Sequence, residues 1–356
     1  MVKKKMTKKQ KRRRKVRIFI IELIVLLFVL VALFFAVKLT KINRQEVKDI
    51  NVNELEEDTL DTLKGYTDIA IFGVDNRSNG DTDTGRTDVI MVASINNDTD
   101  EIKLCSVYRD TFLNQAFTDS QSYNKANNSY AVGGASQAIN MLNVNLDLAI
   151  EDYVTVDFNA VADVVDAVDG VEITVTDEEA KQINKYGKEV ADVVGQDFEK
   201  IPGAGTYNLN GVQAVGFCRI RKTAGNDFRR TERQREVLTK TIEKAKHSDL
   251  KTLNKFVDAI LPEISTSLDY KEILILVAQA FDYQMGENSG FPFDKTTTIV
   301  SGKGDCVIPC DLSHNVIELH KFLYGVEEYN PSETVQNFSA EIEYITGKGI
   351  EDAELD

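Results

Sequence analysis

The chain has 356 residues, of which 42% are hydrophobic and 28% are charged, and this composition is typical of globular domains rather than fibrous or disordered proteins. Eleven lysines and arginines lie within residues 1–17, and because Glu22 and Lys38 cancel, residues 39–356 have a net charge of −26. This acidity argues against a general nucleic-acid binder, because phosphates would be repelled. Four cysteines in a chain of this length exclude a disulfide scaffold.

A hydrophobic segment follows the basic residues. Residues 18–37 are apolar at nineteen of twenty positions, and Glu22 is the only charge. As a helix this segment would span roughly 30 Å, the thickness of a bilayer core. A signal peptide would have a shorter apolar stretch followed by a small-residue cleavage site, and none follows here. We therefore expect a basic cytoplasmic tail at 1–17, an uncleaved transmembrane anchor at 18–37, and residues 39–356 outside the cell under the positive-inside rule.

The remaining chain predicts strands and helices in alternation. Residues 38–64 are polar and acidic, and they predict a stalk or a short membrane-proximal helix. Short runs rich in valine and isoleucine predict buried strands at 69–74, 89–95, 102–108, 153–158 and 171–175, with a last candidate at 296–300. Helical patterns occupy 135–142, 161–168, 230–245, 250–260, 270–281 and 313–323. Such alternation predicts an α/β fold, here over residues 65–326, followed by a loose polar tail at 327–356.

One segment departs from the acidic background. Residues 219–235 have a net charge of +5, contributed by Arg219, Arg221, Lys222, Arg229, Arg230, Arg233 and Arg235 against Asp227 and Glu232. A solvated charge run is the ordinary explanation. Against it, Arg219 and Arg221 share one face of a predicted extended stretch at 218–221. Because a buried arginine needs an anion and a guanidinium matches phosphate through two hydrogen bonds, the cluster predicts a phosphate site.

The helix predicted after this stretch places some of these residues more centrally than others. Asp227 fits its N-cap, and Arg230 and Gln234 lie at the head of its apolar stripe. The same phasing places Arg233 and Arg235 less centrally. We therefore expect Arg230 and Gln234 to face the predicted phosphate site.

Two aspartates form a second candidate cluster. Asp75 ends the first predicted strand and Asp88 begins the second, so a returning loop would bring their carboxylates together. Paired carboxylates near arginines suit Mg²⁺, which takes one or two carboxylates and completes its octahedron with water and substrate phosphate. Solvated loop acids are the common alternative. A calcium loop starting at Asp81 fails on spacing, because Gly85 occupies a ligand position and Val92 stands at the twelfth.

Several other chemistries are disfavoured. The three histidines lie in or beside the C-terminal helices, away from both clusters, and neither a G-x-S-x-G nor a Walker A pattern is present. Cys306 and Cys310 are close enough in sequence for a local disulfide outside the cell, with free thiols as the alternative. Side chains alternate between the two faces of a strand, and this alternation places Cys105 and Cys218 on faces that do not meet, so we expect no disulfide between them.

Together these features resemble the LytR-CpsA-Psr family of membrane-anchored cell-wall enzymes. The shared motifs, in chain order over roughly residues 66–240, are Gly73-x-Asp75-x-Arg77, Arg86-Thr87-Asp88, Ser106-Val107-Tyr108-Arg109-Asp110-Thr111, Lys125-Ala126-Asn127, Gly133-Gly134, Asp169-Gly170-Val171, Leu209-Asn210-Gly211, Arg219-Ile220-Arg221 and Asp227-x-x-Arg230-x-x-Arg233-Gln234. Departures are small: Tyr108 stands where the family often has proline, and Thr87 where it often has serine.

The resemblance implies a fold, an activity and a set of site residues. The fold would be a three-layer α/β/α sandwich with a mixed central sheet and an apolar tunnel for a lipid. The activity would be transfer of a glycopolymer, such as teichoic acid or capsular polysaccharide, from a polyprenyl-pyrophosphate carrier to a peptidoglycan hydroxyl. By similarity, Asp75 and Asp88 would hold Mg²⁺. The phosphates would be bound by Arg86, Arg109, Arg219, Arg221 and Arg230, and substrate also by Lys125, Arg233 and Gln234. Asp227 would orient arginines or accept a proton.

Two other functions are consistent with parts of the sequence. One is a membrane-bound transcriptional regulator whose basic tail contacts nucleic acid, but seventeen residues are too few to fold into a recognition module. The other is a pyrophosphatase that uses the same site with water as the nucleophile. The second differs from the transferase only in its acceptor, so the sequence does not separate them.

Overall fold

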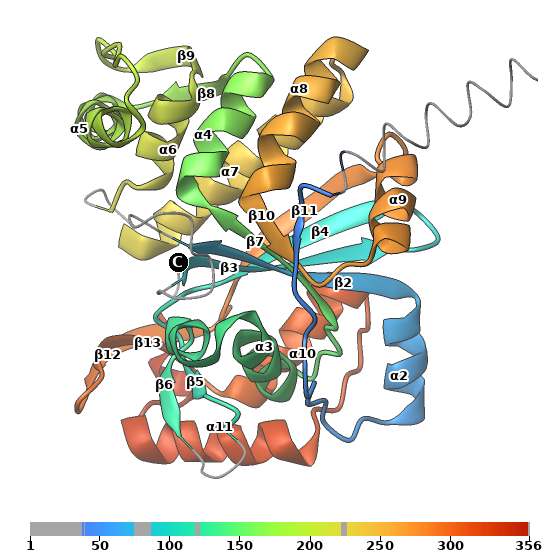
Figure 1. Ribbon diagram of the computed structural model, residues 1–356. Coiled ribbons are helices and arrows are strands. Elements are labelled where there is room, and N and C mark those ends of the chain that lie inside the picture. The colour runs from blue at the N-terminus through green and yellow to red at the C-terminus, as the bar shows by residue number, and fades with distance from the viewer. Residues whose placement is uncertain (1–37, 39, 75–86, 118–121, 222–225, 355–356) are drawn as a thin grey trace, which may run out of the picture. The chain divides into compact units, whose positions relative to one another are not determined.

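The computed structural model describes residues 38, 40–74, 87–117, 122–221 and 226–354 (Figure 1). The chain divides into two compact units, Met1–Ile42 and Asn43–Asp356. The expected basic tail and the anchor at 18–37 lie outside the described residues. Within the described ranges, none of the helices has both the length and the apolar character that a membrane span requires. The architecture below is that of the unit Asn43–Asp356.

A seven-stranded mixed sheet forms the centre of this unit. In spatial order its strands are β1 (Asn43–Arg44), β10 (Ile264–Thr266), β7 (Asp152–Asp157), β2 (Tyr66–Val74), β3 (Thr87–Asn96), β4 (Glu101–Val107) and β11 (Gln284–Phe291). Strand β2 runs parallel to β7 and antiparallel to β3, and β4 runs antiparallel to β3 and parallel to β11. The four middle strands are the valine- and isoleucine-rich runs, which the sequence predicts because both of their faces are buried.

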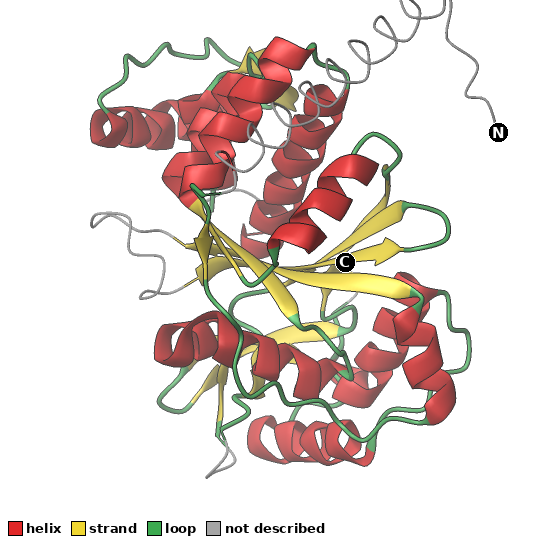
Figure 2. Cartoon of the chain, turned by 45° about the vertical axis from the view of Figure 1, so that its right-hand side comes forward, coloured by secondary structure: helices red, strands yellow, loops and turns green. Residues whose placement is uncertain are grey.

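Helices cover both faces of the sheet, as Figures 1 and 2 show. One face holds α4 (Phe158–Ala167), α6 (Gly211–Cys218), α7 (Asn226–Lys246), α8 (Leu250–Ile260) and α9 (Tyr270–Gln279). The other face holds α2 (Glu57–Lys64), α3 (Asn127–Leu146), α10 (Leu312–Tyr324) and α11 (Glu333–Thr346). The α/β fold with a mixed central sheet, predicted from the sequence, is confirmed.

Smaller elements surround this framework. The remaining helices of the described residues are α5 (Asp177–Val194) and two 3₁₀ turns, Leu261–Glu263 and Ile350–Asp352. Three two-stranded antiparallel sheets pair β5 (Phe112–Asn114) with β6 (Tyr123–Lys125), β8 (Val171–Val175) with β9 (Gly205–Leu209), and β12 (Lys295–Val300) with β13 (Gly304–Pro309). The predicted strand at 171–175 therefore exists, but it pairs outside the central sheet.

Residues 43–64 of the predicted stalk and the predicted loose tail are part of the folded unit. Strand β1 pairs with β10, and the Asn53 side chain donates hydrogen bonds to the Val144 carbonyl (2.9 Å) and to Asp147 Oδ1 (2.7 Å). The expectation of a loose tail was wrong. Its residues form α11, in which apolar side chains at helical spacing, Val335, Phe338 and Ile342, are buried.

The segment before Arg221 also differs from the prediction of an extended stretch. Helix α6 runs to Cys218, and Arg219 is its C-cap with helical backbone angles (φ −91°, ψ −4°). Asn210 begins α6 through a capping box with Gln213. Every residue of α6 is buried, so the segment has no amphipathic signal that would reveal a helix. None of the four cysteines forms a disulfide, and all four thiols are buried.

Candidate functional site

Three arginines from separate segments act on the carboxylate of Asp88, at the start of β3, and two of them bind it directly. Arg109 Nη1 donates a hydrogen bond to Asp88 Oδ1, and Arg221 Nη2 donates one to Oδ2 at 3.1 Å. Arg230, on α7, is 2% exposed, and its charge also acts on Asp88. Burial by itself would raise the pKa of Asp88, but the positive charges of the three arginines outweigh it and hold this pKa below its usual value. Asp88 is therefore a firmly ionised group in a cationic site.

Aromatic contacts join the elements that position these arginines. Tyr108, at the end of β4, contacts Phe228 in the first turn of α7 edge to face, with ring centroids 4.6 Å apart. Lys295 Nζ lies 5.9 Å from the Tyr108 ring and 5.1 Å from the Phe228 ring. This contact ties the strand end that precedes Arg109 to the helix turn that precedes Arg230. Sequence reasoning missed this set, because no local pattern links residues 108, 228 and 295.

A second carboxylate connects Lys125 to the cluster. Asp110 Oδ2 lies 3.4 Å from Arg109 Nε, and Asp110 Oδ1 lies 3.2 Å from Lys125 Nζ. Lys125 is on β6, and the Asn127 amide donates to the Arg109 carbonyl at 3.0 Å. Asp110 was missed as a site residue, although its place directly after Arg109 in the shared motif was a usable signal. Its carboxylate fixes Lys125 and Arg109 relative to each other.

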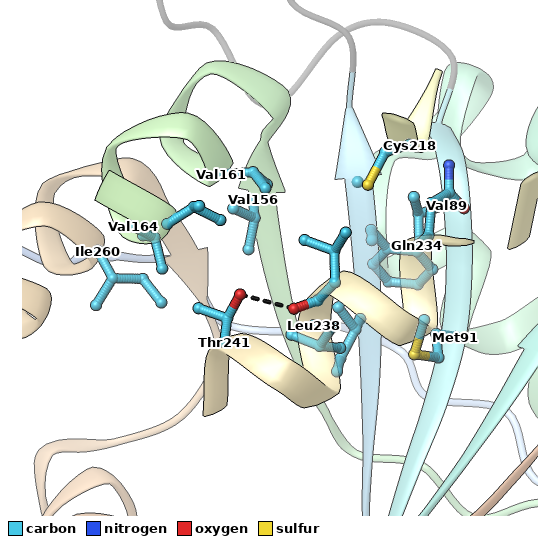
Figure 3. A pocket seen from close by; sticks show the side chains of 15 residues that line it. Val89, Met91, Val156, Val161, Val164, Cys218, Gln234, Leu238, Thr241 and Ile260 are labelled. Carbon is cyan, nitrogen blue, oxygen red and sulfur yellow. Dashed lines mark hydrogen bonds between the residues drawn. The ribbon is translucent and has the colours of Figure 1, made fainter. Parts of the chain in front are cut away.

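An apolar cavity of about 140 Å³, shown in Figure 3, is lined in part by residues close in sequence to the charged cluster. Its lining residues come from β2, β3, β7, α4, α6, α7 and α8, and those labelled in Figure 3 are Val89, Met91, Val156, Val161, Val164, Cys218, Gln234, Leu238, Thr241 and Ile260. Gln234 is the conspicuous polar member. Its buried amide nitrogen and oxygen have no hydrogen-bond partner among the described residues. Such a group is costly to bury unless a ligand satisfies it.

The cavity and the charged cluster are built from adjacent residues of the same elements. Val89 lines the cavity and directly follows Asp88, and Gln234 is one helical turn beyond Arg230. Gly73, on β2, also lines the cavity, and a Cβ at this position would lie 2.8 Å from the Val89 side chain. Only glycine therefore allows β2 and β3 to approach so closely here. The site thus combines a cationic end with an apolar end.

Comparison with known proteins identifies the family. The sequence model of the LytR_cpsA_psr family matches residues 30–288, which is more than half of the chain. The chain belongs to the LytR-CpsA-Psr family. Among curated members, the polyisoprenyl-teichoic acid–peptidoglycan teichoic acid transferase TagT of Bacillus subtilis is 30% identical over 219 residues, covering 60% of this chain and 64% of TagT.

A second curated relative and a solved structure are also similar to this chain. The corresponding transferase TagU of Bacillus cereus is 34% identical over 202 residues, covering 56% of this chain and 60% of TagU. The chain thus spans less than two thirds of the length of these curated relatives. A structure of YwtF (TagT) with bound octaprenyl pyrophosphate lipid has the same fold, with a TM-score of 0.53, 23% identity, and coverage of 79% of this chain and 97% of that chain.

The structure brings together only some of the residues that the LytR-CpsA-Psr motifs single out. Asp88, Arg109, Arg221 and Arg230 form one cluster, Lys125 reaches it through Asp110, and Gln234 lines the cavity. Arg219 lies apart, with its guanidinium 5.9 Å above the Tyr186 ring. Asp75 and Arg86 lie outside the described residues, as does the side chain of Asp227.

Arg233 and Arg235 differ from what helix phasing predicts. Both are buried: Arg233 Nε donates to Glu179 Oε1 of α5 at 3.0 Å, and Arg235 Nε donates to Asn288 Oδ1 of β11 at 2.9 Å. Helix α7 is buried on several sides at this point, so a single apolar stripe does not identify its buried residues. The Arg233 side chain is 4% exposed and is paired with Glu179, whereas the Arg221 side chain is 45% exposed.

The metal prediction rests on Asp88 alone within the described residues. No group of three histidine, cysteine or acidic side chains in the described ranges is arranged to hold a metal ion. Asp88 fits a magnesium ligand in its chemistry, because it is ionised, its side chain is 20% exposed, and each oxygen that accepts an arginine hydrogen bond retains a further lone pair.

Proposed function

We propose that this protein transfers a glycopolymer from a polyprenyl-pyrophosphate carrier to peptidoglycan and joins the two through a phosphodiester. The observation that carries the proposal is the contact between an arginine cluster and an apolar cavity, which matches a lipid whose head group is a pyrophosphate. Family membership supports it, since TagT and TagU are named as teichoic acid transferases and the YwtF (TagT) structure binds octaprenyl pyrophosphate.

The chemistry requires charge neutralisation and a proton acceptor. A peptidoglycan hydroxyl attacks the phosphorus that bears the glycan, a new P–O bond forms, the pyrophosphate P–O bond breaks, and polyprenyl phosphate leaves with the bonding electrons. Arg109, Arg221 and Arg230 stabilise the charge on the phosphates. Asp88 is a poor acceptor for the hydroxyl proton because the arginines lower its pKa. This leaves Asp227 as our candidate for that role.

Magnesium belongs to the proposal as well. We propose that Asp88, together with Asp75, holds Mg²⁺, which would neutralise negative charge that develops on the leaving phosphate. The ionised and partly exposed Asp88 carboxylate supports this assignment. Arg86 and Arg219 are proposed as further phosphate ligands on the strength of the shared motifs alone.

The proposed location is the outer face of the cytoplasmic membrane. The basic residues of 1–17 support a cytoplasmic N-terminus, and the apolar segment 18–37 supports a single membrane anchor. Residues 39–356 would then lie outside the cell, where peptidoglycan is the acceptor. A polyprenyl carrier is itself confined to this membrane, so the anchor keeps enzyme and donor on one surface.

Reconstitution tests the transfer reaction directly. The full-length protein in detergent is incubated with lipid-linked teichoic acid, peptidoglycan oligomers and Mg²⁺, and a phosphodiester conjugate is expected together with polyprenyl phosphate. Release of phosphorylated polymer without conjugate would instead establish a pyrophosphatase with water as acceptor. Consumption of no lipid-linked donor under any of these conditions would contradict both enzymatic functions. A parallel reaction with lipid-linked capsular polysaccharide identifies the polymer.

A further inference from the structure

Helix α9 presents large apolar side chains to solvent. Five of the exposed large hydrophobic residues in the described ranges lie within residues 270–281: Tyr270, Leu274, Ile275, Val277 and Phe281. Only Ile273 and Leu276 of the helix pack inward, against the cluster formed by Ile69, Ile95 and Leu268. A contiguous exposed apolar surface of this kind marks a binding site rather than an ordinary surface.

The place of α9 in the chain indicates what covers this surface. Arg44 of β1 pairs with Thr266 of β10, and α9 begins four residues after Thr266. The segment 38–42 separates β1 from the hydrophobic segment 18–37, and these five residues extend over at most about 20 Å. If residues 18–37 cross the membrane, as proposed above, a short tether leads from the bilayer to the sheet edge from which α9 starts.

We propose that the outer face of α9 docks on the outer leaflet of the membrane, with its apolar side chains in the interfacial region. This inference rests on the membrane anchor in the proposed function. Lys271 lies three residues before Leu274 and four before Ile275 on the helix. Its methylene chain can therefore lie along the apolar face while its ammonium group reaches lipid phosphates. The other candidate occupant, a second copy of the chain, is distinguished from the membrane by the brominated-lipid experiment below.

Docking at this position has a consequence for the lipid substrate. Ile69 packs beneath α9, and Ile71, two residues further along β2, lines the apolar cavity on the same face of the sheet. Met91 of β3 lines the cavity too, and Ile95 packs beneath α9. A continuous apolar strip therefore joins the surface beneath α9 to the cavity. Docking of α9 would place the start of this strip beside the bilayer that contains the carrier.

Tryptophan fluorescence tests the proposal, because the chain contains no tryptophan. Phe281→Trp, at a position that is 57% exposed, is introduced into the full-length protein and reconstituted into phosphatidylcholine vesicles with or without brominated acyl chains. The matched control is Tyr344→Trp, at a position 85% exposed on α11, which covers the opposite face of the sheet (Figure 1). We expect emission at shorter wavelength and loss of fluorescence in brominated vesicles for Phe281→Trp only.

Flotation of the vesicles separates this proposal from that of the anchor. If the protein floats with the vesicles but the tryptophans of Phe281→Trp and Tyr344→Trp have the same emission wavelength and the same quenching, α9 does not dock, whereas the membrane anchor is supported. A shift to shorter wavelength without quenching by brominated lipid would mean that protein covers α9, and this also overturns the proposal. Failure to float overturns the anchor and the docking together. Adding Leu274→Asp to Phe281→Trp should reduce the quenching without changing flotation, since Leu274 is exposed and contributes little to folding.

Discussion

The arginines around Asp88 differ in exposure. A substitution at an exposed arginine tests its role in binding without a large effect on folding. Arg230 is buried, whereas the Arg221 side chain is 45% exposed and has one hydrogen bond to Asp88 in the described structure. A change at Arg221 should therefore leave folding largely intact. Arg221 is thus the better residue for measuring what a guanidinium contributes to the reaction.

We expect Arg221→Lys to reduce the transfer rate by about 10²–10³, because lysine keeps the charge but loses the planar pair of donors that matches phosphate. Its melting temperature should stay near that of the unsubstituted protein. Arg229→Lys is the matched control on α7, where the Arg229 side chain is 55% exposed and pairs with Glu232 at 2.5 Å. Equal rates for both variants would show that Arg221 does not bind the reacting phosphates.

The lowered pKa of Asp88 predicts a pH-dependent contribution to stability. Because this pKa lies below its unfolded value, the carboxylate stabilises the fold above the unfolded pKa, and this contribution is lost as the pH falls through the folded pKa. Asp88→Asn should lower the free energy of unfolding by about 1–3 kcal/mol at neutral pH, since arginine donors lose their acceptor. The difference in free energy of unfolding between Asp88→Asn and the unsubstituted protein should become smaller below about pH 4.

Urea unfolding of Asp88→Asn and of the unsubstituted protein, from neutral pH to below about pH 4, measures this difference in free energy of unfolding. Asp192→Asn is the control, because Asp192 pairs with Lys188 on the exposed surface of α5, where an ion pair is worth at most about 1 kcal/mol. If the free energy of unfolding of Asp88→Asn differs from that of the unsubstituted protein by the same amount at every pH, the carboxylate charge does not stabilise the site.

At the level of elements, the start of α7 is held by contacts on two sides. Arg233 binds Glu179 of α5, and Arg235 binds Asn288 of β11, so the helix that bears Arg230 is fixed to its neighbours by buried polar groups. The guanidinium of Arg233 also lies 5.6 Å from the Phe217 ring of α6. We expect from these contacts that Arg233 positions α7, whereas the family motif implies substrate binding; the following variants distinguish the two roles.

Arg233→Ala should lower the free energy of unfolding by about 3–5 kcal/mol, because it leaves the buried Glu179 carboxylate without its counter-charge. The double variant Arg233→Met with Glu179→Leu should recover much of this loss, since it removes both charges. Denaturant unfolding measures both effects. Loss of transfer activity in Arg233→Ala without loss of stability would instead favour direct substrate binding.

Helix α11 should contribute to the stability of the whole unit. Ile342 is 1% exposed in the main hydrophobic core, so Ile342→Ala should cost about 2–5 kcal/mol, through lost burial and the cavity left behind. Tyr344→Ala, on the same helix but exposed, should change stability by no more than about 0.5 kcal/mol. Thermal unfolding of the two variants distinguishes a packed helix from a loose tail, for which both changes would be neutral.

At the level of the whole molecule, the proposed topology predicts a simple pattern of proteolysis. Protease added to cells from which the wall has been removed should digest residues 39–356 and spare a tag at the N-terminus, because the basic tail stays in the cytoplasm. Immunoblotting for the two ends measures this. A protected C-terminus, or a soluble form released by cleavage after residue 36, would contradict the topology.

The sequence by itself determined the middle strands of the sheet, the family and the charged chemistry of the site. Runs of valine and isoleucine indicate a strand that is buried on both faces. Charged motif residues such as Asp88 and Arg109 indicate the charged chemistry of the site even when their contacts in the fold are not known. These features could be read from the sequence because each depends on residue types at short, fixed spacing.

Only the tertiary structure decided which arginines meet at Asp88. Arg230 and Arg233 are three residues apart on α7, yet the charge of Arg230 acts on Asp88 whereas Arg233 binds Glu179 in the first turn of α5. Helix α6 has no amphipathic period because neighbours bury it on every side, and the apolar residues of α9 are exposed because no other helix of the described residues covers them. A local pattern reports period and composition, whereas the partner opposite each face is set by segments distant in the chain.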